Sequence, residues 1–170
     1  FHDNQYLFLG ESGNTFSRIN YDGSPDNTFG INGFKTIENT GQTLDLKGFK
    51  LYDGTPYIFG ETTVSSNDNA FITKMSSNGN PDSDFGTGGK IAVDLGQNET
   101  FRDIYFNADG SFFAIGTQTY PDFTHRAFVC KFHADGTPDT SFNGTGTKFF
   151  TINQKEQGVK ILPAGNNLFL

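Results

Sequence analysis

Short apolar runs alternate with polar stretches rich in Gly, Asn, Asp and Ser along the whole chain. The central part of the sequence carries four such runs, at residues 48–52, 57–60, 70–75 and 90–93. Short apolar runs bounded by turn-forming residues are typical of β-strands. Between the first two runs, Asp53-Gly54 predicts a hairpin turn, in which both central residues adopt positive φ. The pattern predicts a unit of four antiparallel strands and few helices.

The same order of runs recurs on both sides of this central unit. The strands expected outside it are residues 7–9, 16–19 and 33–37 before it, and 104–106, 112–115, 128–132, 147–152 and 168–170 after it. We therefore expect a single segment over residues 1–170. It consists of a partial unit without its first strand (1–37), two complete units (46–94 and 101–152) and the start of another (158–170).

Several of the expected strands are apolar on consecutive residues instead of alternating, which suits sheets that are covered on both faces. Four short antiparallel strands make up one blade of a β-propeller, and a closed propeller has about four to eight blades. The sequence therefore predicts an all-β, propeller-like array of about three blades, as a segment of a larger propeller. The chain has no initial Met and no signal-peptide pattern, so a targeting signal is expected outside it.

One polar stretch marks the repeat more clearly than the strands do. It reads Asp135-Gly136-Thr137-Pro138-Asp139-Thr140-Ser141-Phe142-Asn143-Gly144, and looser copies lie at residues 22–30 and 78–86. Its phenylalanines, Phe29, Phe85 and Phe142, recur at intervals of about 56 residues, which is in the range of repeat folds. Proline fixes φ and the glycines supply left-handed positions, so the stretch is predicted to turn the chain between the third and fourth strands.

This motif resembles the delta-60 repeat, which runs approximately apolar, Arg or Lys, apolar, a short spacer, and then Asp-Gly-x-x-Asp-x-x-Phe-Gly-x-Gly-Gly. Residues 82–90 follow it almost letter for letter, whereas Asn78, Ile31-Asn32 and Asn143 depart from it. The resemblance implies a β-propeller in large exported or cell-surface proteins of bacteria, with type IX secretion as one route of export. The family has no settled activity, so the resemblance implies an architecture and a location only.

Charge and composition narrow the set of partners. The formal net charge is −7 and the pI is about 4.7, and Lys and Arg do not cluster, which argues against a nucleic-acid groove and an anionic membrane surface. No apolar run approaches the ~20 residues of a membrane-spanning helix. We expect neither nucleic-acid binding nor membrane insertion.

Cys130 is the only cysteine, so the chain can form neither an internal disulfide nor a cysteine-rich zinc site. It occupies the strand position of Ser17 and Thr73 in the sister units. We expect a small buried side chain there and not a nucleophile.

Three aspartates of the motif, Asp26, Asp82 and Asp139, each follow a cation by eight residues: Arg18, Lys74 and Lys131. A carboxylate on a tight turn can pair with a cation on the adjoining strand or accept backbone N–H bonds. Because an active site is needed only once whereas this arrangement recurs three times, we interpret these aspartates, with Phe29, Phe85 and Phe142, as structural turn residues.

The middle copy also permits a second interpretation. Asn80, Asp82 and Asp84 place oxygen-bearing side chains at alternate positions, which is a feature of Ca²⁺ loops. The stretch has no downstream Glu at the spacing of an EF-hand. An Asx-type turn is the favoured alternative, and we expect no other cofactor and no metal site.

The longest expected loop, residues 117–126, carries the densest mixture of functional groups: Tyr120, Asp122, His125 and Arg126. They do not form an acid/base pair at a telling distance, so we expect no catalytic residue. Tyr and Arg do anchor contacts in recognition surfaces, and these four residues are the candidate ligand-binding set. A solvated loop is the alternative.

In a four-stranded meander the Asp-Gly turns and the repeated motif share one end, whereas the links after strands two and four, which vary between units, share the other. Variable loops on one face of a regular scaffold are typical of a binding face. We expect a non-catalytic binding or display scaffold of an exported or cell-surface bacterial protein, with a protein, a surface glycan or the secretion machinery as partner. The alternatives are a glycan-active enzyme whose site lies outside this segment, and a spacer or cargo region of a secreted protein.

Overall fold

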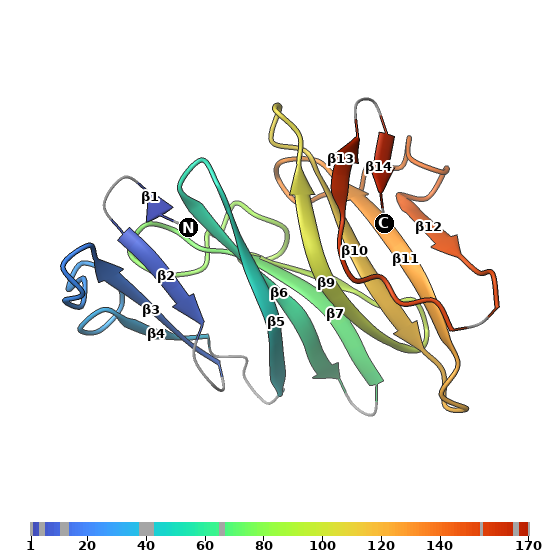
Figure 1. Ribbon diagram of the computed structural model, residues 1–170, viewed down its shortest axis with the longest axis horizontal. Helices are drawn as coiled ribbons and strands as arrows, with labels where there is room; N and C mark the ends of the chain where they lie inside the picture. The colour runs from blue at the N-terminus through green and yellow to red at the C-terminus, as the bar shows by residue number, and fades with distance from the viewer. Residues whose placement is uncertain are drawn as a thin grey trace.

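The computed structural model describes residues 2–3, 6–10, 14–37, 43–64, 67–153, 155–164 and 167–169. Over these ranges the chain forms strands and turns and no helix (Figure 1). The strands are β1 (His2–Asp3), β2 (Tyr6–Gly10), β3 (Thr15–Asn20), β4 (Phe34–Thr36), β5 (Leu44–Tyr52), β6 (Thr55–Val64), β7 (Asn67–Lys74), β8 (Lys90–Val93), β9 (Asn98–Phe106), β10 (Phe112–Thr119), β11 (His125–Phe132), β12 (Thr147–Phe150), β13 (Leu162–Ala164) and β14 (Asn167–Phe169).

The strands form three four-stranded antiparallel sheets and one hairpin. Sheet 1 has the order β1-β2-β3-β4, sheet 2 β5-β6-β7-β8, sheet 3 β9-β10-β11-β12, and β13 pairs with β14. Each sheet is a meander in which every strand pairs with its neighbour in sequence. The predicted all-β fold and its antiparallel four-stranded units are therefore confirmed, while the propeller-like arrangement stays a prediction.

Sheet 1 differs from the expectation of three strands. Its extra strand, β1, has only two residues and pairs with β2 through His2 and Leu7. A polar pair, His2-Asp3, has no apolar pattern from which a strand could be predicted, and it is strand only because β2 provides an edge.

The hairpins are also longer than expected, and two predicted loops are wrong over most of their length. The apolar runs placed one strand at 57–60 and the next at 70–75 with a loop between them, but β6 continues to Val64 and β7 begins at Asn67. Likewise the expected loop 117–126 shrinks to residues 120–124 between β10 and β11. The polar extensions are rich in Thr, which suits strands, and cross-strand pairing continues beyond the apolar residues.

The first strands of sheets 2 and 3 bend at equivalent irregularities of pairing, between Leu46 and Gly48 and opposite Gly116. At Gly116 a Cβ would lie 2.4 Å from the carbonyl oxygen of Thr100. Only glycine allows this approach of two backbones, which is a regular role of glycine in strands.

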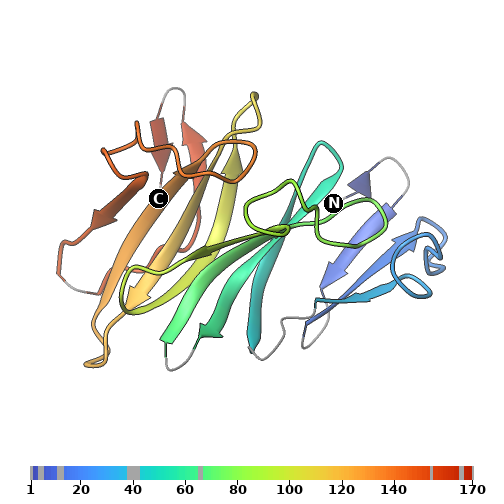
Figure 2. The same cartoon turned by 180° about the vertical axis from the view of Figure 1, so that it is seen from behind.

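The three sheets stand side by side in a row, with the β13–β14 hairpin at one end (Figures 1 and 2). The turns at 53–54 and 107–111 and the motif copies at 76–89 and 133–146 lie at one end of the strands. We call this the clasp end. The links between β6 and β7, between β8 and β9 and between β10 and β11 lie at the opposite end, which we call the loop end.

Apolar side chains fill the spaces between neighbouring sheets. Phe16 of sheet 1 shares a buried cluster with Ile58 and Phe71 of sheet 2. A larger cluster joins the other face of sheet 2, including Tyr57 and Ile72, to sheet 3; its sheet 3 members are Phe101, Ile104, Phe112, Ala114, Phe128, Cys130 and Phe132. Both faces of the central sheet are therefore covered, which explains its consecutive apolar residues.

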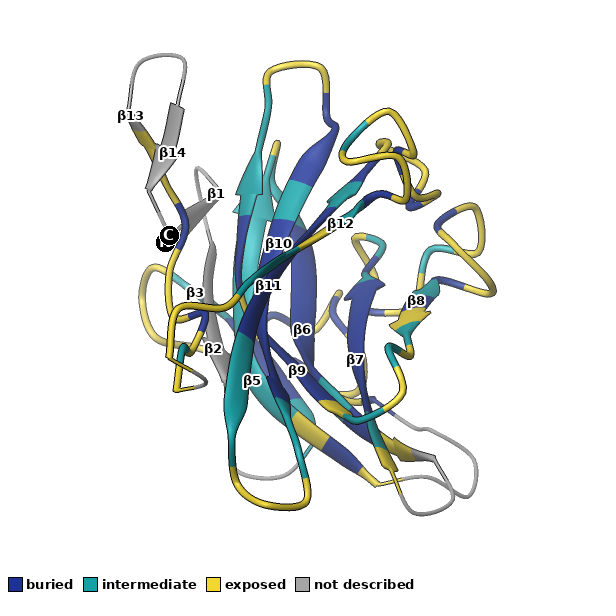
Figure 3. Ribbon diagram, turned by 90° about the vertical axis from the view of Figure 1, so that its right-hand side faces the viewer, coloured by how far each residue is buried: buried dark blue, intermediate teal, exposed yellow. Residues whose placement is uncertain are grey.

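The outer face of sheet 3 carries a smaller cluster. Ile115 and Val129 are buried there under Ile161, with Phe113 and Phe142 packed around them. The middle of strands β6, β7, β10 and β11 is buried, whereas β5 is mostly half-buried and the turns are exposed (Figure 3). The packed strands thus hold the turns at both of their ends in place.

Candidate functional site

The three copies of the motif each place the aspartate against the cation eight residues earlier. Arg18 Nε lies 2.6 Å from Asp26 Oδ2, Lys74 Nζ lies 2.7 Å from Asp82 Oδ2, and Lys131 Nζ lies 2.8 Å from Asp139 Oδ2. Each cation is on the third strand of its sheet and each aspartate is on the following turn, so the pair fastens the turn to the strand. We call each pair with its turn a clasp.

The second oxygen of each aspartate holds the turn itself. Asp26 Oδ1 accepts hydrogen bonds from the backbone N–H and the hydroxyl of Thr28, at 2.9 and 2.7 Å. Asp139 Oδ1 accepts the same two bonds from Ser141. The hydrogen bond from Lys131, with that from Ser141, lowers the pKa of Asp139 to about 2. These carboxylates are ionised turn locks and are poorly suited to proton transfer.

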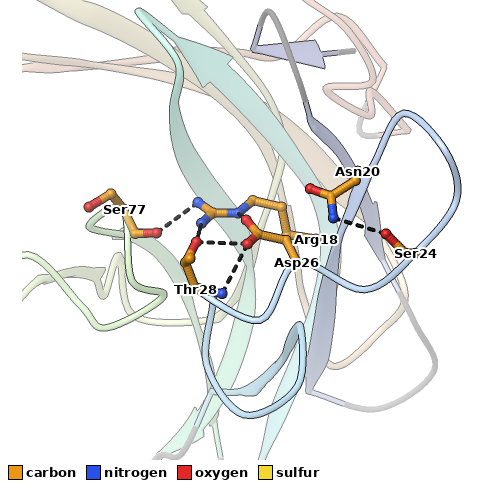
Figure 4. Close-up of polar contacts among 6 residues, drawn as sticks. All are labelled: Arg18, Asn20, Ser24, Asp26, Thr28 and Ser77. Carbon is orange, nitrogen blue, oxygen red and sulfur yellow. Dashed lines mark hydrogen bonds and ion pairs between the residues drawn. The ribbon is translucent and has the colours of Figure 1, made fainter.

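The first clasp additionally ties sheet 1 to sheet 2. Arg18 Nη1 donates to the carbonyl oxygen of Ser77 at 2.7 Å, and Nη2 donates to Thr28 Oγ1 at 3.0 Å (Figure 4). Burial alone would raise the pKa of Asp26, but the hydrogen bonds from Thr28 and Arg18 outweigh it and the pKa is lowered. The planar fork of Arg18 donates from three separate nitrogens to three acceptors, whereas the Lys side chains of the other two copies carry all their donors on a single nitrogen.

Two of the three side chains of the possible calcium loop, those of Asn80 and Asp82, already have other partners. Asn80 Oδ1 accepts a hydrogen bond from Lys35 Nζ at 2.9 Å, and Asp82 is paired with Lys74. The backbone N–H of Asp84 donates to Asp82 Oδ1, which is the Asx-type turn expected as the alternative. In the part of the chain that the structure describes, no group of three or more His, Cys, Asp or Glu is placed to hold a metal ion.

Two hollows of about 480 and 630 Å³ lie at the clasp end, between the first two units. The charged residues of the former include Arg18, Lys74 and Asp82, which already take part in clasp pairs. The charges of Arg18, Lys74 and Asp82 are thus already neutralised within the chain, and we take the loop end as the better candidate.

At the loop end, the structure brings all four predicted ligand residues to one place. Tyr120, Asp122, His125 and Arg126 line a hollow of about 370 Å³ together with Thr124 and Thr151. The first five belong to the β10–β11 hairpin, and Thr151 follows β12, the neighbouring strand. The extended pairing of β10 with β11 is what carries this hairpin tip beyond the core.

Gln118, which the sequence reasoning missed, organises two of these residues. Its Oε1 accepts a hydrogen bond from Arg126 Nη2 at 2.6 Å and another from the Tyr120 hydroxyl at 3.1 Å. The Arg126 guanidinium also lies 3.5 Å from the ring centroid of Phe149. Tyr120 and Arg126 are thus held in fixed orientations, and preformed side chains bind with a smaller loss of entropy.

His125 and Asp122 have different surroundings. His125 Nδ1 lies 3.1 Å from Thr119 Oγ1. Asp122 Oδ1 accepts hydrogen bonds from the N–H and the hydroxyl of Thr124, and these bonds, the one from the hydroxyl first, lower its pKa. Asp122 thus acts first as a lock of the turn, like the aspartates of the clasps.

Phe123, at the tip of this turn, is the most unusual residue of the site. Its φ is 62° and its side chain is 82% exposed. Three related turns have the sequence Asp-Gly-Ser or Asp-Gly-Thr, and their glycines have φ values of 84°, 83° and 86° at Gly23, Gly110 and Gly136. Asp122-Phe123-Thr124 follows the same sequence pattern with a phenylalanine in the glycine position. This match could have revealed the residue before the structure was known.

A buried carboxyl lies beneath the same hairpin. Glu99 is fully buried, and its Oε1 accepts hydrogen bonds from Gln118 Nε2 and the N–H of Gln97. Its Oε2 has no hydrogen-bond partner among the described residues, and neither has Arg126 Nε. Burial raises the pKa of Glu99, partly offset by the bond from Gln118. Gln118 therefore links the hollow to a carboxyl that water does not reach.

Cys130, by contrast, is buried and free, and burial raises the pKa of its thiol to about 12. At neutral pH it is a thiol and not a nucleophilic thiolate. This is the small buried residue that its strand position predicts.

Comparison with known proteins gives no match to a family model, to a curated protein or to a solved structure. The described ranges also contain no helix of the length and apolar character needed to cross a membrane. Any statement on function therefore depends on the geometry of the chain itself.

Proposed function

We propose that this chain is part of a propeller-like, non-catalytic scaffold of an exported or cell-surface bacterial protein, and that the β10–β11 hairpin binds a surface glycan or a protein. The stacking of successive four-stranded sheets and the recurrence of the clasp at one end support the architecture. The resemblance of the motif to the delta-60 repeat supports the location.

The observation that carries the binding proposal is Phe123. A bulky residue in the left-handed region costs about 1–2 kcal/mol relative to the right-handed conformation, and strain of this kind is concentrated at functional sites. The strained residue exposes an aromatic ring to solvent in the turn whose flanking residues Asp122 and Thr124 line the hollow. A turn that only had to reverse the chain would carry glycine, as the three related turns do.

The composition of the hollow fits recognition better than catalysis. An aromatic ring and a Tyr–Arg pair are the anchors found at the centres of binding surfaces. The Asp122 carboxylate already accepts a hydrogen bond from Thr124. The buried carboxyl of Glu99 is bonded to Gln118 and lies on the side of it that faces away from the hollow. A ligand here would meet aromatic surface and hydrogen-bonding groups of fixed orientation.

The substitution Phe123→Gly separates binding from folding. We expect it to stabilise the protein by about 1 kcal/mol, because glycine adopts φ of 62° without strain. We also expect it to weaken ligand binding by at least tenfold, since the exposed ring is lost. Thermal unfolding measures the first effect, and a glycan array followed by calorimetry on the bound glycan measures the second.

Tyr21→Ala is the matched control, because Tyr21 is an aromatic residue that is 61% exposed at the clasp end. It should leave array binding unchanged. If the array is blank, photo-cross-linking from a benzoyl-phenylalanine at position 123 on bacterial cells tests for a protein partner. Equal binding by the wild type and Phe123→Gly would refute the role of this hairpin.

A further inference from the structure

Two contacts of identical construction connect successive units at the clasp end. A Cβ on Gly79 would lie 2.9 Å from the ring of Phe29, and a Cβ on Gly136 would lie 3.0 Å from the ring of Phe85. In both places the clasp phenylalanine of one unit therefore lies directly on the turn glycine of the next unit. We call this contact a joint.

A backbone hydrogen bond completes each joint. The N–H of Gly30, which follows Phe29, donates to the carbonyl oxygen of Asn78 at 2.9 Å. In the same way the N–H of Gly86 donates to the carbonyl oxygen of Asp135 at 2.8 Å. Because the next unit covers each ring in this way, the side chains of Phe29 and Phe85 are only 1% exposed.

The first unit has the receiving half of a third joint. Gly23 has φ of 84°, the same as Gly79, and its N–H donates to Asn20 just as that of Gly79 donates to Ser76. Gly23 is nevertheless exposed, and its Cβ position has no heavy atom of another residue within 4 Å. The turn is thus formed without the ring that covers its two equivalents.

The third unit has the opposite half. Phe142 packs on Phe113 but stays partly exposed, unlike Phe29 and Phe85. Asn143, in the position of Gly30 and Gly86, has φ of 53°, against 56° and 57° for the two glycines. The turn is also closed by the same two backbone hydrogen bonds as in the complete joints, from the N–H of Phe142 to Asp139 and from the N–H of Gly146 to Phe142.

We infer that Phe142 and the N–H of Asn143 form a docking surface for the turn glycine of a further repeat that continues in sequence from β14. The beginning of such a unit is already in place. Ile161, just before β13, is 1% exposed and packs on Ile115 and Val129, on the outer face of sheet 3. Ile161 therefore packs on the face of sheet 3 that points away from sheet 2, just as sheet 3 packs on the face of sheet 2 that points away from sheet 1.

The register of β13 and β14 identifies which unit they begin. Ala164 pairs with Asn167, at the same spacing along the chain as Tyr52 and Thr55, which pair in sheet 2. They correspond to the first two strands of a four-stranded unit, whose third and fourth strands would bring a turn glycine to Phe142. A second copy of the whole chain fits this face less well, because Ile161 already covers part of it.

Matched glycine substitutions test the joint in the chain as it is. Gly23→Ala, Gly79→Ala and Gly136→Ala impose the same backbone strain, since the three φ values are 84°, 84° and 86°. Only Gly79→Ala and Gly136→Ala direct the new Cβ into a phenylalanine ring. In urea denaturation we expect their unfolding equilibrium constants to exceed that of Gly23→Ala roughly tenfold. Equal changes in the unfolding equilibrium constant at the three positions would contradict a stabilising role of the joint.

An appended unit tests the docking surface itself. Since Asn167 corresponds to Thr55, the position after Leu170 corresponds to Phe59, so a second copy of residues 59–93 is attached there. We expect hydrogen exchange at the Asn143 amide to slow at least tenfold relative to the original chain. The control is the same extended chain with the appended copy of Gly79 changed to asparagine, which accepts the left-handed conformation but obstructs the ring.

Four results would contradict the inference. The first is unchanged exchange at Asn143 in the extended chain, and the second is equal protection in its asparagine control. The third is concentration-dependent self-association of the original chain in sedimentation, abolished by Phe142→Ala, because Phe142 would then receive a second copy. An appended unit that exchanges rapidly over its whole length also counts against it. These readouts concern the clasp end and are independent of ligand binding at the hairpin.

Discussion

Arg18 and Lys131 occupy the same position of the repeat but differ in how far water reaches them. The side chains of Arg18 and Asp26 are 9% and 4% exposed, whereas those of Lys131 and Asp139 are 25% and 10% exposed. Removal of one partner from a buried pair leaves an uncompensated charge. The same motif therefore contains clasps of different strength.

Alanine substitutions should reveal this difference. We expect Arg18→Ala to lower the free energy of unfolding by about 3 kcal/mol, because Asp26 is left buried without its cation and Ser77 loses a hydrogen bond. Lys131→Ala should cost clearly less, because its pair is more accessible to water. Urea denaturation of both variants measures the difference, and equal losses would contradict it.

Substitution of the buried Glu99 should have the opposite effect and stabilise the protein. Its pKa in the folded protein is raised above the ordinary value of 4.5, so its ionisation disfavours the folded state as the pH rises above about 4.5. Glu99→Gln should therefore increase the stability at pH 7 and have little effect below pH 4. Thermal unfolding across this range checks the prediction, and a variant less stable than the wild type at pH 7 would refute it.

Phe123 shows the limit of sequence reasoning for a single residue. Tyr120, Asp122, His125 and Arg126 could be selected from their chemistry, and the structure places them around one hollow. Phe123 lies in the middle of that set but was not selected, because its positive φ shows in the sequence only through the match of Asp122-Phe123-Thr124 to the Asp-Gly-Thr type of turn. Gln118 was missed for a related reason, since its contacts depend on which residues face each other across β10 and β11.

The strands separate into a buried middle and polar ends. Phe112 of β10 is fully buried, and the ring centroids of Phe132 and Phe106 lie 5.1 and 5.3 Å from its own. Phe34 of β4 is 42% exposed. The contribution of a phenylalanine to the free energy of unfolding thus depends on the strand that carries it.

We expect Phe112→Ala to lower the free energy of unfolding by about 3–5 kcal/mol, since it leaves a cavity between sheets 2 and 3. Phe34→Ala, at the edge of sheet 1, should change it by only about 0.5 kcal/mol. Urea denaturation with a common m-value gives both numbers. A larger effect at Phe34 than at Phe112 would show that the core has been placed between the wrong sheets.

At the level of elements, the apolar runs were sufficient to predict the existence and order of nearly all strands but not their lengths. The end of β6 and the start of β11 consist largely of polar residues that pair across the hairpin without contributing to the core. Such extensions depend on the partner strand, which a local pattern does not contain. The motif, in contrast, was predictable as a turn because its Asp, Pro and Gly act locally.

The whole molecule is held together at its turns by ionised aspartates. Seven of them have a pKa below the usual 3.8: Asp22, Asp26, Asp82, Asp109, Asp122, Asp135 and Asp139. A carboxylate whose pKa is lowered on folding stabilises the protein above its unfolded pKa, and this contribution is lost as the pH falls through the folded pKa.

The free energy of unfolding should therefore decrease as the pH is lowered from about 4 to about 2, the window between the ordinary pKa of 3.8 and that of Asp139. Chemical denaturation at pH 5, 4, 3 and 2 measures this decrease. Asp139→Asn should show a smaller decrease over the same window, because it has no proton to take up. A stability that is constant between pH 4 and pH 2 would be incompatible with turns locked by carboxylates.

The confinement of the joints to one end has a consequence for how such a chain can be modified. The joints of Phe29 and Phe85 lie at the clasp end, and the core between sheets 2 and 3 involves the middle of β10 and β11, so the hairpin tip at residues 120–124 takes no part in either contact. A peptide inserted after Phe123 would thus alter what the protein touches while the spacing of its sheets is preserved. The same insertion between Asp139 and Phe142 would break a clasp. The molecule keeps assembly and recognition on separate segments, so either can be exchanged without rebuilding the other.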